Sequence, residues 1–352
     1  MSVADLISEF IVLNQHDNVA TARRTLKSGT SVAAGESGLV LRQTIPGGHK
    51  VALVSINAGE QLVKYGQIIG FAKTAIEPGD WVHTHNVELR AVGRDYGFCE
   101  EIVKTSPLER DKDTFPGFAR PGGKAGTRNY IAVISSVNCS ASVARYVADH
   151  FRSSDFQSDF VNVDGVVAFT HKGGCSYDPN HGHEVLQRVI AGMARHPNIG
   201  GYVLVGLGCE VNQVPGLVEK HHLDQLQDGE QAPTFLTIQQ TGGVRKTVES
   251  AVKAVEKMLP DVNALQRTTQ PVSKLAMAMN CGGSDANSGI SANPALGVAS
   301  DELVRQGAAS VFGETTEIYG AEHLLTRRAV TREVGEKLVS QTRWWEQHTA
   351  MF

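Results

Sequence analysis

Four of the five cysteines in this sequence follow short apolar runs and lie beside glycine, serine, asparagine or an acidic residue. They are Cys139, Cys175, Cys209 and Cys281, and the runs before them are residues 130–134, 166–169, 202–205 and 275–279. Ligands gather at the carboxyl ends of strands in parallel α/β sheets, so thiols at such ends converge on one crevice. A single cysteine is more often a packing residue, but four in equivalent places favour a metal or catalytic cluster.

The spacing of the cysteines and glycines disfavours several other sites. The sequence contains no C-x-x-C pair, which would indicate zinc, and neither G-x-G-x-x-G nor G-x-x-x-x-G-K-[ST]. The fragment Gly206-Leu207-Gly208 is weak evidence for a dinucleotide site, and the nearby Glu210 would repel a pyrophosphate. A dinucleotide-dependent dehydrogenase is therefore disfavoured.

Polar residues accompany each of the four thiols. Asn138-Cys139-Ser140 begins a predicted helix, whose unpaired backbone N–H groups favour an anion or a thiolate. His171 and Lys172 place a base and a cation shortly before Cys175. The last two thiols are followed by Glu210 and Asn212, and by a glycine pair with Ser284-Asp285.

The first ninety residues contain a second group of polar residues, the histidines His16, His49, His83 and His85. Residues two apart in a strand point to the same face, so His83 and His85 could present two imidazoles to one ion or substrate. Lys64-Tyr65 adds a cation and a phenol. The alternative is a set of exposed surface histidines with a lysine lying along the surface, and the spacing alone leaves both open.

Composition limits the class of protein. The chain has 352 residues, of which 41% are hydrophobic and 20% charged, and its net charge is −4, so it is globular and offers no basic surface for nucleic acid. It has neither an apolar run long enough to span a bilayer nor a leader pattern near its start, so we expect no membrane partner and a cytoplasmic location. Thiols stay reduced there, which favours ligands or catalysts over disulfides.

Residues 1–92 alternate β-like runs with turns and contain one helical pattern, Ala20–Leu26, so they predict a small β-rich domain. Residues 93–115 have the composition of a linker. Residues 116–265 alternate strands with amphipathic helices, and residues 266–352 contain a second, shorter segment of this type. The predicted fold class is α/β, with a mostly parallel sheet after the β-rich domain.

Helical spacing covers residues 142–151, 184–195, 245–258 and 299–306, and the chain ends in a predicted helix from Arg332. Residues 260–270 begin with a proline and lack apolar periodicity, which indicates a break or a surface loop.

Taken together, the motifs resemble the altronate and galactarate dehydratase family of sugar-acid hydro-lyases, which also includes a sulfolactate sulfo-lyase. The matching segments run nearly from end to end and lie at residues 17–20, 48–53, 64–66, 83–86, 126–129, 206–210, 281–285 and 320–322. The resemblance implies an N-terminal domain of the SAF type and iron-dependent removal of water from an aldonic or aldaric acid. Family members of the fused type continue past the position of Phe352, so it also implies that the segment 266–352 is incomplete.

The resemblance implies roles for individual residues. Removing water from a 2,3-dihydroxy acid needs a base for the proton beside the carboxylate, and a metal can hold the carboxylate and the departing hydroxyl. We expect His49, His171 or Lys172 as the base. The residues expected to contact the substrate are Lys50, Arg128, Ser140, Asn212, Ser284 and Asp285.

The expected metal ligands are Cys139, Cys175, Cys209 and Cys281, with His16, His83 and His85 as a second set. Thiolates suit an iron–sulfur cluster, whereas imidazoles suit a single ferrous ion or another divalent cation, and the sequence does not decide between them.

D-Altronate is the favoured substrate, because His83-Thr84-His85 is similar to the altronate type, and galactarate comes next. The expected product is a 2-keto-3-deoxy acid. The alternative is a non-catalytic relative that binds a sugar acid or a metal. The sequence leaves open whether the chain forms a homo-oligomer.

Overall fold

The structure is a computed structural model that describes residues 9–32, 38–90, 96–103, 105–106, 108, 113–152, 155–176, 181–225, 233–283 and 287–351. The chain divides into two compact units by its internal contacts. One unit comprises residues 1–106, 277–302 and 310–352, and the other comprises residues 107–276 and 303–309. Within the described ranges, every helix is too short or too polar to span a bilayer.

The N-terminal domain consists of short antiparallel strands, as the sequence predicts. Its largest sheet has the order β1-β2-β5-β8, and two smaller sheets have the orders β3-β4 and β6-β7-β9. The strands are β1 (Phe10–Ile11), β2 (Val19–Ala22), β3 (Ser31–Val32), β4 (Leu39–Val40), β5 (Lys50–Ala52), β6 (Gln61–Lys64), β7 (Gln67–Ala72), β8 (Trp81–Val82) and β9 (Val87–Glu88). Two apolar clusters fill the space between them.

A fourfold local repeat builds this domain. An apolar residue followed three positions later by glycine recurs at residues 26–29, 45–48, 56–59 and 76–79. Each apolar residue is at most 2% exposed and each glycine has a φ between 80° and 87°. The apolar residues pair by isolated bridges, Leu26 with Ile45 and Ile56 with Ile76. Glycine is required because left-handed backbone costs other residues free energy.

The central domain is built on a four-stranded sheet whose neighbouring strands are all parallel, in the order β13-β12-β14-β15. The strands are β12 (Tyr130–Ser135), β13 (Gly165–Phe169), β14 (Ile199–Gly206) and β15 (Thr234–Thr237). Side chains of β12 alternate between two cores: Ile131 and Val133 pack on one face, and Ala132 and Ile134 on the other. Both faces are buried, which explains the continuous apolar runs in the sequence.

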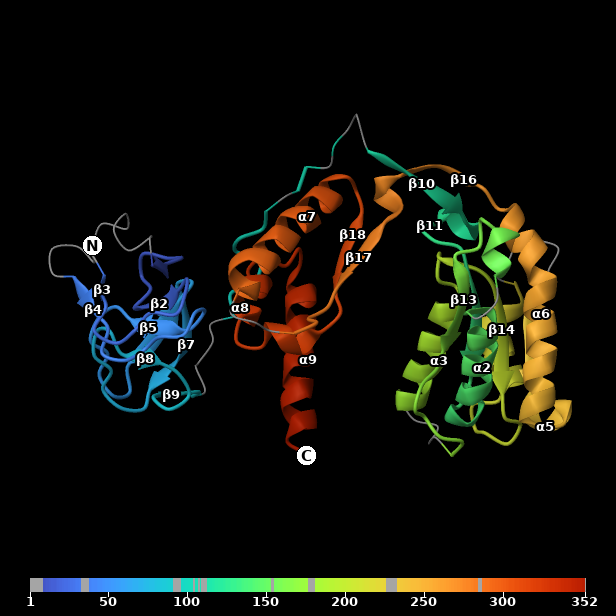
Figure 1. The fold of residues 1–352 in the computed structure, drawn as a ribbon, viewed down its shortest axis with the longest axis horizontal. Coiled ribbons are helices and arrows are strands. Elements are labelled where there is room, and N and C mark those ends of the chain that lie inside the picture. The colour runs from blue at the N-terminus through green and yellow to red at the C-terminus, as the bar shows by residue number, and fades with distance from the viewer. Residues whose placement is uncertain are drawn as a thin grey trace. The chain divides into compact units, whose positions relative to one another are not determined.

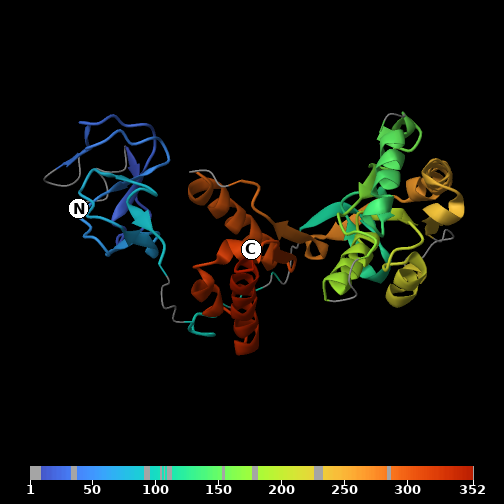
Figure 2. The same ribbon diagram turned by 90° about the horizontal axis from the view of Figure 1, so that it is seen from below.

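Helices cover both faces of this sheet (Figures 1 and 2). One face packs against α2 (Ala141–Arg152) and α6 (Val244–Ala264), and the other against α3 (His181–Ala194) and α4 (Val214–His221). The short α5 (Ile238–Thr241) follows β15. The predicted helices of this domain are therefore present, with boundaries shifted by a few residues.

An antiparallel ribbon adjoins the sheet. It consists of β10 (Thr114–Ala119), flanked by β11 (Ala125–Gly126) and β16 (Arg267–Pro271). Strand β16 follows α6, so the ribbon joins the start and the end of the central domain.

The remaining elements follow β16. They are β17 (Ala276–Met279), a π-helical turn (Ser288–Ala292), α7 (Asn293–Arg305), β18 (Ala309–Phe312), α8 (Glu322–Thr326) and α9 (Arg332–Thr349). Strands β17 and β18 form a two-stranded sheet. The predicted terminal helix corresponds to α9, whose Thr331 side chain accepts a hydrogen bond from the Val334 amide as an N-cap.

Three sequence-based predictions of structure are wrong. Residues 20–26 are not helical, because Val19–Ala22 forms β2 in the centre of the N-terminal sheet. The break predicted from residue 260 begins only after Ala264, since α6 continues past Pro260 with Leu259 and Val262 buried in the core. Strand β17 belongs to a separate sheet with β18, so Cys281 does not follow a strand of the four-stranded sheet.

Candidate functional site

Three of the predicted thiols follow neighbouring strands of the parallel sheet. Cys139 follows β12, Cys175 follows β13 and Cys209 follows β14, and each residue is exposed. Strands β13 and β14 lie on either side of β12. Because parallel strands end at the same edge, the fold brings these three thiols to one edge of the sheet.

Backbone hydrogen bonds join the loops that carry the three thiols. The Asn138 amide donates to the carbonyl oxygen of Gly173 over 2.8 Å, and the Val211 amide donates to that of Cys175 over 2.9 Å. The loop after β13 is therefore tied to the loops on both sides. This pairing fixes the three cysteine-bearing segments relative to one another.

The end of β15 extends this arrangement through Gln239. Its backbone amide donates to the carbonyl oxygen of Leu207 over 3.0 Å. Its side-chain amide donates to Sγ of Cys209 over 3.3 Å. Hydrogen bonds to a sulfur orient it and stabilise a thiolate or a metal-bound form.

The thiols also interact electrostatically. The pKa of Cys139 is raised, first because its sulfur loses hydration although the residue as a whole is exposed, and second because of the neighbouring Cys175. Cys209 makes a smaller contribution in the same direction. This electrostatic interaction agrees with the position of the three loops at one edge of the sheet.

Glu210 organises the loop after β14. It is 2% exposed, and its carboxylate accepts hydrogen bonds from Ser136 Oγ (3.0 Å) and from the amides of Leu207 (3.0 Å) and Gly208 (2.6 Å). The carboxylate therefore joins the β12 and β14 ends. Its position next to a thiol in sequence gave no indication of this structural role.

Two residues predicted to contact the substrate are occupied within the protein. Ser140 is fully buried, and its hydroxyl lies 2.9 Å from the carbonyl oxygen of Val137 and 2.7 Å from that of Val205. Asn212 is 3% exposed, donates to the Ser136 carbonyl oxygen over 3.0 Å and accepts from Gln187 over 3.1 Å. Both side chains therefore hold together the segments that follow the strands at this edge of the sheet.

His171 and Lys172 lie at the same edge, after β13. The Gly173 amide donates to His171 Nδ1 over 3.0 Å, so a neutral ring carries its proton on Nε2. Burial lowers the pKa of His171, although the backbone of Ser136 and Ser135 opposes this shift. Its Nε2 is buried and forms no hydrogen bond with the described residues. His171 thus fixes the loop, whereas Lys172 is exposed.

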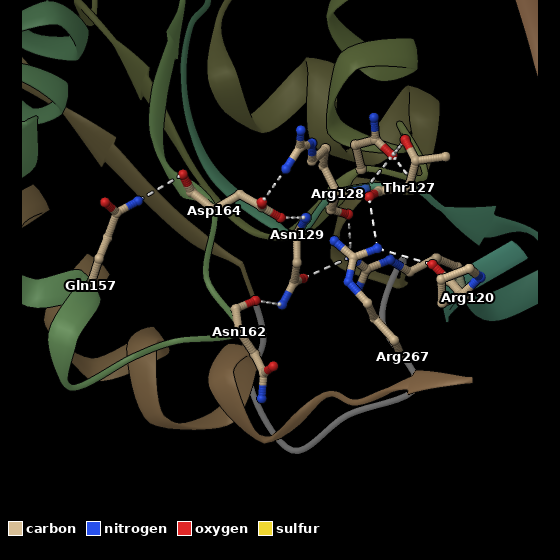
Figure 3. Close-up of polar contacts among 10 residues, drawn as sticks. Arg120, Thr127, Arg128, Asn129, Gln157, Asn162, Asp164 and Arg267 are labelled. Carbon is tan, nitrogen blue, oxygen red and sulfur yellow. Dashed lines mark hydrogen bonds and ion pairs between the residues drawn. The ribbon is translucent and has the colours of Figure 1, made fainter. Parts of the chain in front are cut away.

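Arg128 lies at the opposite edge of the sheet. It precedes the first residue of β12, whose six residues span roughly 20 Å, while the thiols follow the last residue. Its guanidinium forms an ion pair of 3.0 Å with Asp164 (Figure 3). Arg128, which is expected to contact the substrate, therefore lies at the edge of the sheet opposite to the thiols.

Figure 3 shows that the motif around Arg128 belongs to a network that joins the ribbon to the amino edge of the sheet. Arg120 donates to Asn129 Oδ1 over 2.7 Å, and Asn129 donates to carbonyl oxygens of Asn162 (2.8 Å) and Val262 (2.9 Å). Arg267 reaches the Thr127 carbonyl oxygen over 3.0 Å. Burial lowers the pKa of Arg120 to about 10.

The N-terminal domain contains a cluster of rings formed by His49, Trp81, His83 and His85. The centroids of His49 and His83 are 5.4 Å apart, and those of His83 and His85 are 6.5 Å apart. His83 and His85 lie in a turn after β8 and not in a strand, since the Asn86 amide donates to the His83 carbonyl oxygen.

His49 is oriented by its neighbour in this ring cluster. The Trp81 indole N–H donates to His49 Nδ1 over 3.2 Å, so a neutral His49 carries its proton on Nε2 and offers a donor. His16 lies elsewhere in the domain, in the turn that ends at Asp17, where a ring nitrogen is 3.3 Å from Gln15 Nε2.

Two lysines of the N-terminal domain, Lys50 and Lys64, interact electrostatically. Lys64 is only 8% exposed, and its ammonium is 4.7 Å from the centroid of the Tyr65 ring. Burial lowers the pKa of Lys50 and the charge of Lys64 lowers it further; burial also lowers that of Lys64, against the attraction of Asp17. Within the described ranges neither lysine has an ion-pair partner. The sequence identified Lys50, but nothing in it distinguished Lys64 from a surface lysine.

Cys281 lies after β17, and its backbone amide donates to Glu314 over 2.9 Å. Ser284 and Asp285, which were predicted to contact the substrate, lie outside the described residues. Among the residues that the structure does describe, no group of three or more histidine, cysteine, aspartate or glutamate side chains is arranged to hold a single metal ion.

A β-rich domain followed by a parallel sheet with thiols at its carboxyl edge defines a class of multidomain α/β protein, and sequence comparison specifies the family. Residues 8–90 match the altronate/galactarate dehydratase SAF domain. Residues 117–263 match the D-galactarate dehydratase/altronate hydrolase second domain, and residues 272–352 match the D-galactarate/altronate dehydratase C-terminal region. The chain belongs to the altronate and galactarate dehydratase family.

Three curated relatives match nearly all of the chain. It is 33% identical to altronate dehydratase of Bacillus subtilis over 95% of the chain and 65% of the relative. It is 38% identical to galactarate dehydratase (L-threo-forming) of Escherichia coli over 97% and 66%, and 32% identical to altronate dehydratase of Escherichia coli over 97% and 67%. The chain thus spans about two thirds of the length of these relatives.

Proposed function

We propose that this chain carries out the dehydration of a sugar acid to a 2-keto-3-deoxy acid. The observation that supports the proposal most strongly is its similarity, over at least 95% of its length, to proteins named altronate or galactarate dehydratase. Dehydration requires a group that takes the proton beside the carboxylate, a group that assists the departing hydroxyl and a cation that holds the carboxylate. The described residues offer candidates for each role.

Lys50 and Lys64 are suited to hold the substrate carboxylate. They are partly or largely buried, lie close enough to repel each other and have no ion-pair partner within the described ranges. A carboxylate placed between them would relieve this repulsion, so binding it is favourable. An anionic substrate supplies such a carboxylate.

Proton transfer is assigned to Lys172 or, alternatively, to His49. Lys172 is exposed in the loop of Cys175 and is accessible to a substrate, whereas His171 holds that loop through Gly173. His49 offers an N–H at Nε2, which suits protonation of a departing hydroxyl.

We propose that the reaction is metal-assisted. A bound metal would act as a Lewis acid on the carboxylate and the departing hydroxyl. The donors present fit iron: thiols at the sheet edge, and imidazoles of His83 and His85 in the ring cluster.

D-Altronate is the preferred substrate in this proposal, on the basis of the His83-Thr84-His85 segment. Galactarate is the second candidate. It is supported by the 38% identity to the galactarate dehydratase, which exceeds the 33% and 32% found for the two altronate dehydratases. A few hydroxyl contacts are enough to set such a preference.

The test is an assay of the anaerobically purified, iron-supplied protein with altronate, galactarate and sulfolactate in separate reactions. Formation of a 2-keto-3-deoxy acid from altronate at the highest kcat/KM is the expected result. Faster turnover of galactarate would reverse the substrate order. Tight binding of these acids without any product would instead establish a non-catalytic binding protein.

A further inference from the structure

We propose that Cys139, Cys175 and Cys209 form a three-thiolate site for an iron–sulfur cluster. The inference deepens the proposed function, on which its catalytic meaning rests, but it can be tested without any assay of dehydration. It commits to three thiols at one sheet edge, and Cys281 is not among them.

The topology is the first support. The three cysteines follow three adjacent parallel strands, so they come from loops at one edge and not from scattered positions. Cys281 follows β17, which pairs with β18 in a separate sheet. The reason that places the first three thiols together therefore does not apply to the fourth.

The loops are held in position without the cofactor. The hydrogen bonds from Asn138 to Gly173 and from Val211 to Cys175 link the three segments through their backbones. The buried carboxylate of Glu210 joins the ends of β12 and β14 through Ser136 and two loop amides. A site fixed in this way loses little conformational entropy when it binds its ligand.

The chemistry of the donors selects the cofactor. Thiolates favour iron–sulfur clusters, zinc and cuprous copper over hard cations. The described residues form no ready-made group around a single ion. In a [4Fe–4S] cluster each thiolate binds a different iron, so the thiols surround a body larger than one ion. Three thiols from three separate loops, without the C-x-x-C pair typical of zinc sites, fit a cluster better than zinc.

The surroundings of Cys209 agree with this assignment. The Gln239 side-chain amide donates to its sulfur, and such hydrogen bonds are among the features that tune protein-bound clusters. All three residues are exposed, so cluster assembly needs no opening of the core. On binding, each thiol gives up its proton to solvent and forms one sulfur–iron bond. Three protein thiolates leave one iron of a [4Fe–4S] cluster without a protein sulfur.

The experiment is anaerobic reconstitution of the protein with ferric iron, sulfide and dithiothreitol, followed by removal of unbound iron. We expect equimolar iron and acid-labile sulfide, about four of each per chain. Charge-transfer absorption in the visible range and an electron paramagnetic resonance signal after reduction should accompany them. Iron without sulfide, or bound zinc in place of iron, would overturn the proposal.

Serine variants identify the ligands. Cys139→Ser, Cys175→Ser and Cys209→Ser should each lose most of the iron and sulfide, whereas Cys99→Ser and Cys281→Ser should keep both. Equal loss in Cys281→Ser would replace the three-thiol site by a four-thiol site. Unchanged sulfide in the first three variants would exclude the site.

A measurement on the unmodified protein avoids the risk that a variant fails to fold. Alkylation of the thiols, read by mass spectrometry before and after reconstitution, should show protection of Cys139, Cys175 and Cys209 by at least about 10-fold. Cys281 should alkylate equally in both states. Failure of the cluster to form would refute this inference alone, even in a protein that dehydrates a sugar acid, and a cluster without dehydration would refute only the proposed function.

Discussion

The side-chain amide of Gln239 donates a hydrogen bond of 3.3 Å to the sulfur of Cys209. Gln239 follows the end of β15 and Cys209 follows the end of β14. The contact therefore joins segments that follow two neighbouring strands of the sheet. A donor directed at a sulfur restrains the side chain and compensates negative charge on it.

We therefore expect Gln239→Ala to weaken iron retention by about 10-fold, because partners of a metal ligand typically contribute this much. The substitution keeps the backbone amide that binds Leu207. Competition with a chelator measures the effect. Gln240→Ala, at the next and exposed residue, is the matched control, and an equal loss in both variants would contradict the role of Gln239.

Glu210 provides a second prediction about the sheet edge. Replacing it with glutamine puts an amide group where Ser136 Oγ and two backbone amides now donate. We expect Glu210→Gln to reduce the free energy of unfolding by about 2–3 kcal/mol, since at least one buried donor loses its acceptor. Urea unfolding measures the change. The exposed Glu219→Gln should change it by less than about 0.5 kcal/mol.

The sequence predicted the strands of the central sheet well. Tyr130–Ile134 and Tyr202–Val205 read as continuous apolar runs because parallel strands covered on both faces have no polar side. It failed at Ala20–Leu26, where residues with good helix propensity form β2. That strand pairs with β1 and β5, and pairing with distant residues overrides local propensity.

The candidate site could be predicted only in part. The sequence placed Cys139, Cys175 and Cys209 at strand ends, and the order of the strands in the sheet shows that these three ends are neighbours. It could not show that Ser140 and Asn212 are occupied, because their partners Val205 and Gln187 lie 65 and 25 residues away. Whether a polar side chain already has hydrogen-bond partners inside the protein depends on tertiary contacts, and the residue type alone does not predict these contacts.

The glycines of the N-terminal repeat give a stability prediction. Gly79 has a φ of +87°, and a Cβ there would lie 2.1 Å from the carbonyl oxygen of Val40. Gly29 has a φ of +80° but nothing within 4 Å of its Cβ position. The two glycines share a backbone conformation and differ in the space around them.

Gly29→Ala should therefore cost only backbone strain, about 1–2 kcal/mol. Gly79→Ala should cost about 3 kcal/mol or more, because the Val40 backbone must also move. Thermal unfolding of both variants separates these contributions. Equal destabilisation would mean that the steric contact at Gly79 is relaxed at no cost.

We expect substitutions of Arg128 and of Lys50 to have different effects on the KM for the sugar acid. Arg128 is 58% exposed in its ion pair with Asp164 at the amino edge of the sheet, so Arg128→Ala should cost below about 1 kcal/mol of stability and leave KM unchanged. Lys50→Met should raise KM for the sugar acid by about 10- to 100-fold, since it removes a charged hydrogen-bond donor. A large KM effect in Arg128→Ala would place substrate at the amino edge.

The pH dependence of substrate binding follows from the two lysines. Burial lowers the pKa of Lys50 below its ordinary value, the nearby charge of Lys64 lowers it further, and burial also lowers the pKa of Lys64. Both ammonium groups are charged below these lowered pKa values, so the attraction for a carboxylate is complete there. It is lost as the pH rises through them, earlier than for an exposed lysine.

Equilibrium binding of the acid, measured against pH, should therefore decline on the alkaline side before an ordinary lysine loses its proton. Lys64→Met removes the repulsion from Lys50, so the pKa of Lys50 should rise and the decline should move to higher pH, while affinity at neutral pH falls. Lys73→Met, in which the lysine removed donates to the Thr84 carbonyl oxygen, is the control. A decline that stays in place in Lys64→Met would show that the two lysines do not share one carboxylate, because their mutual repulsion is what lowers the pKa of Lys50 beyond the effect of burial.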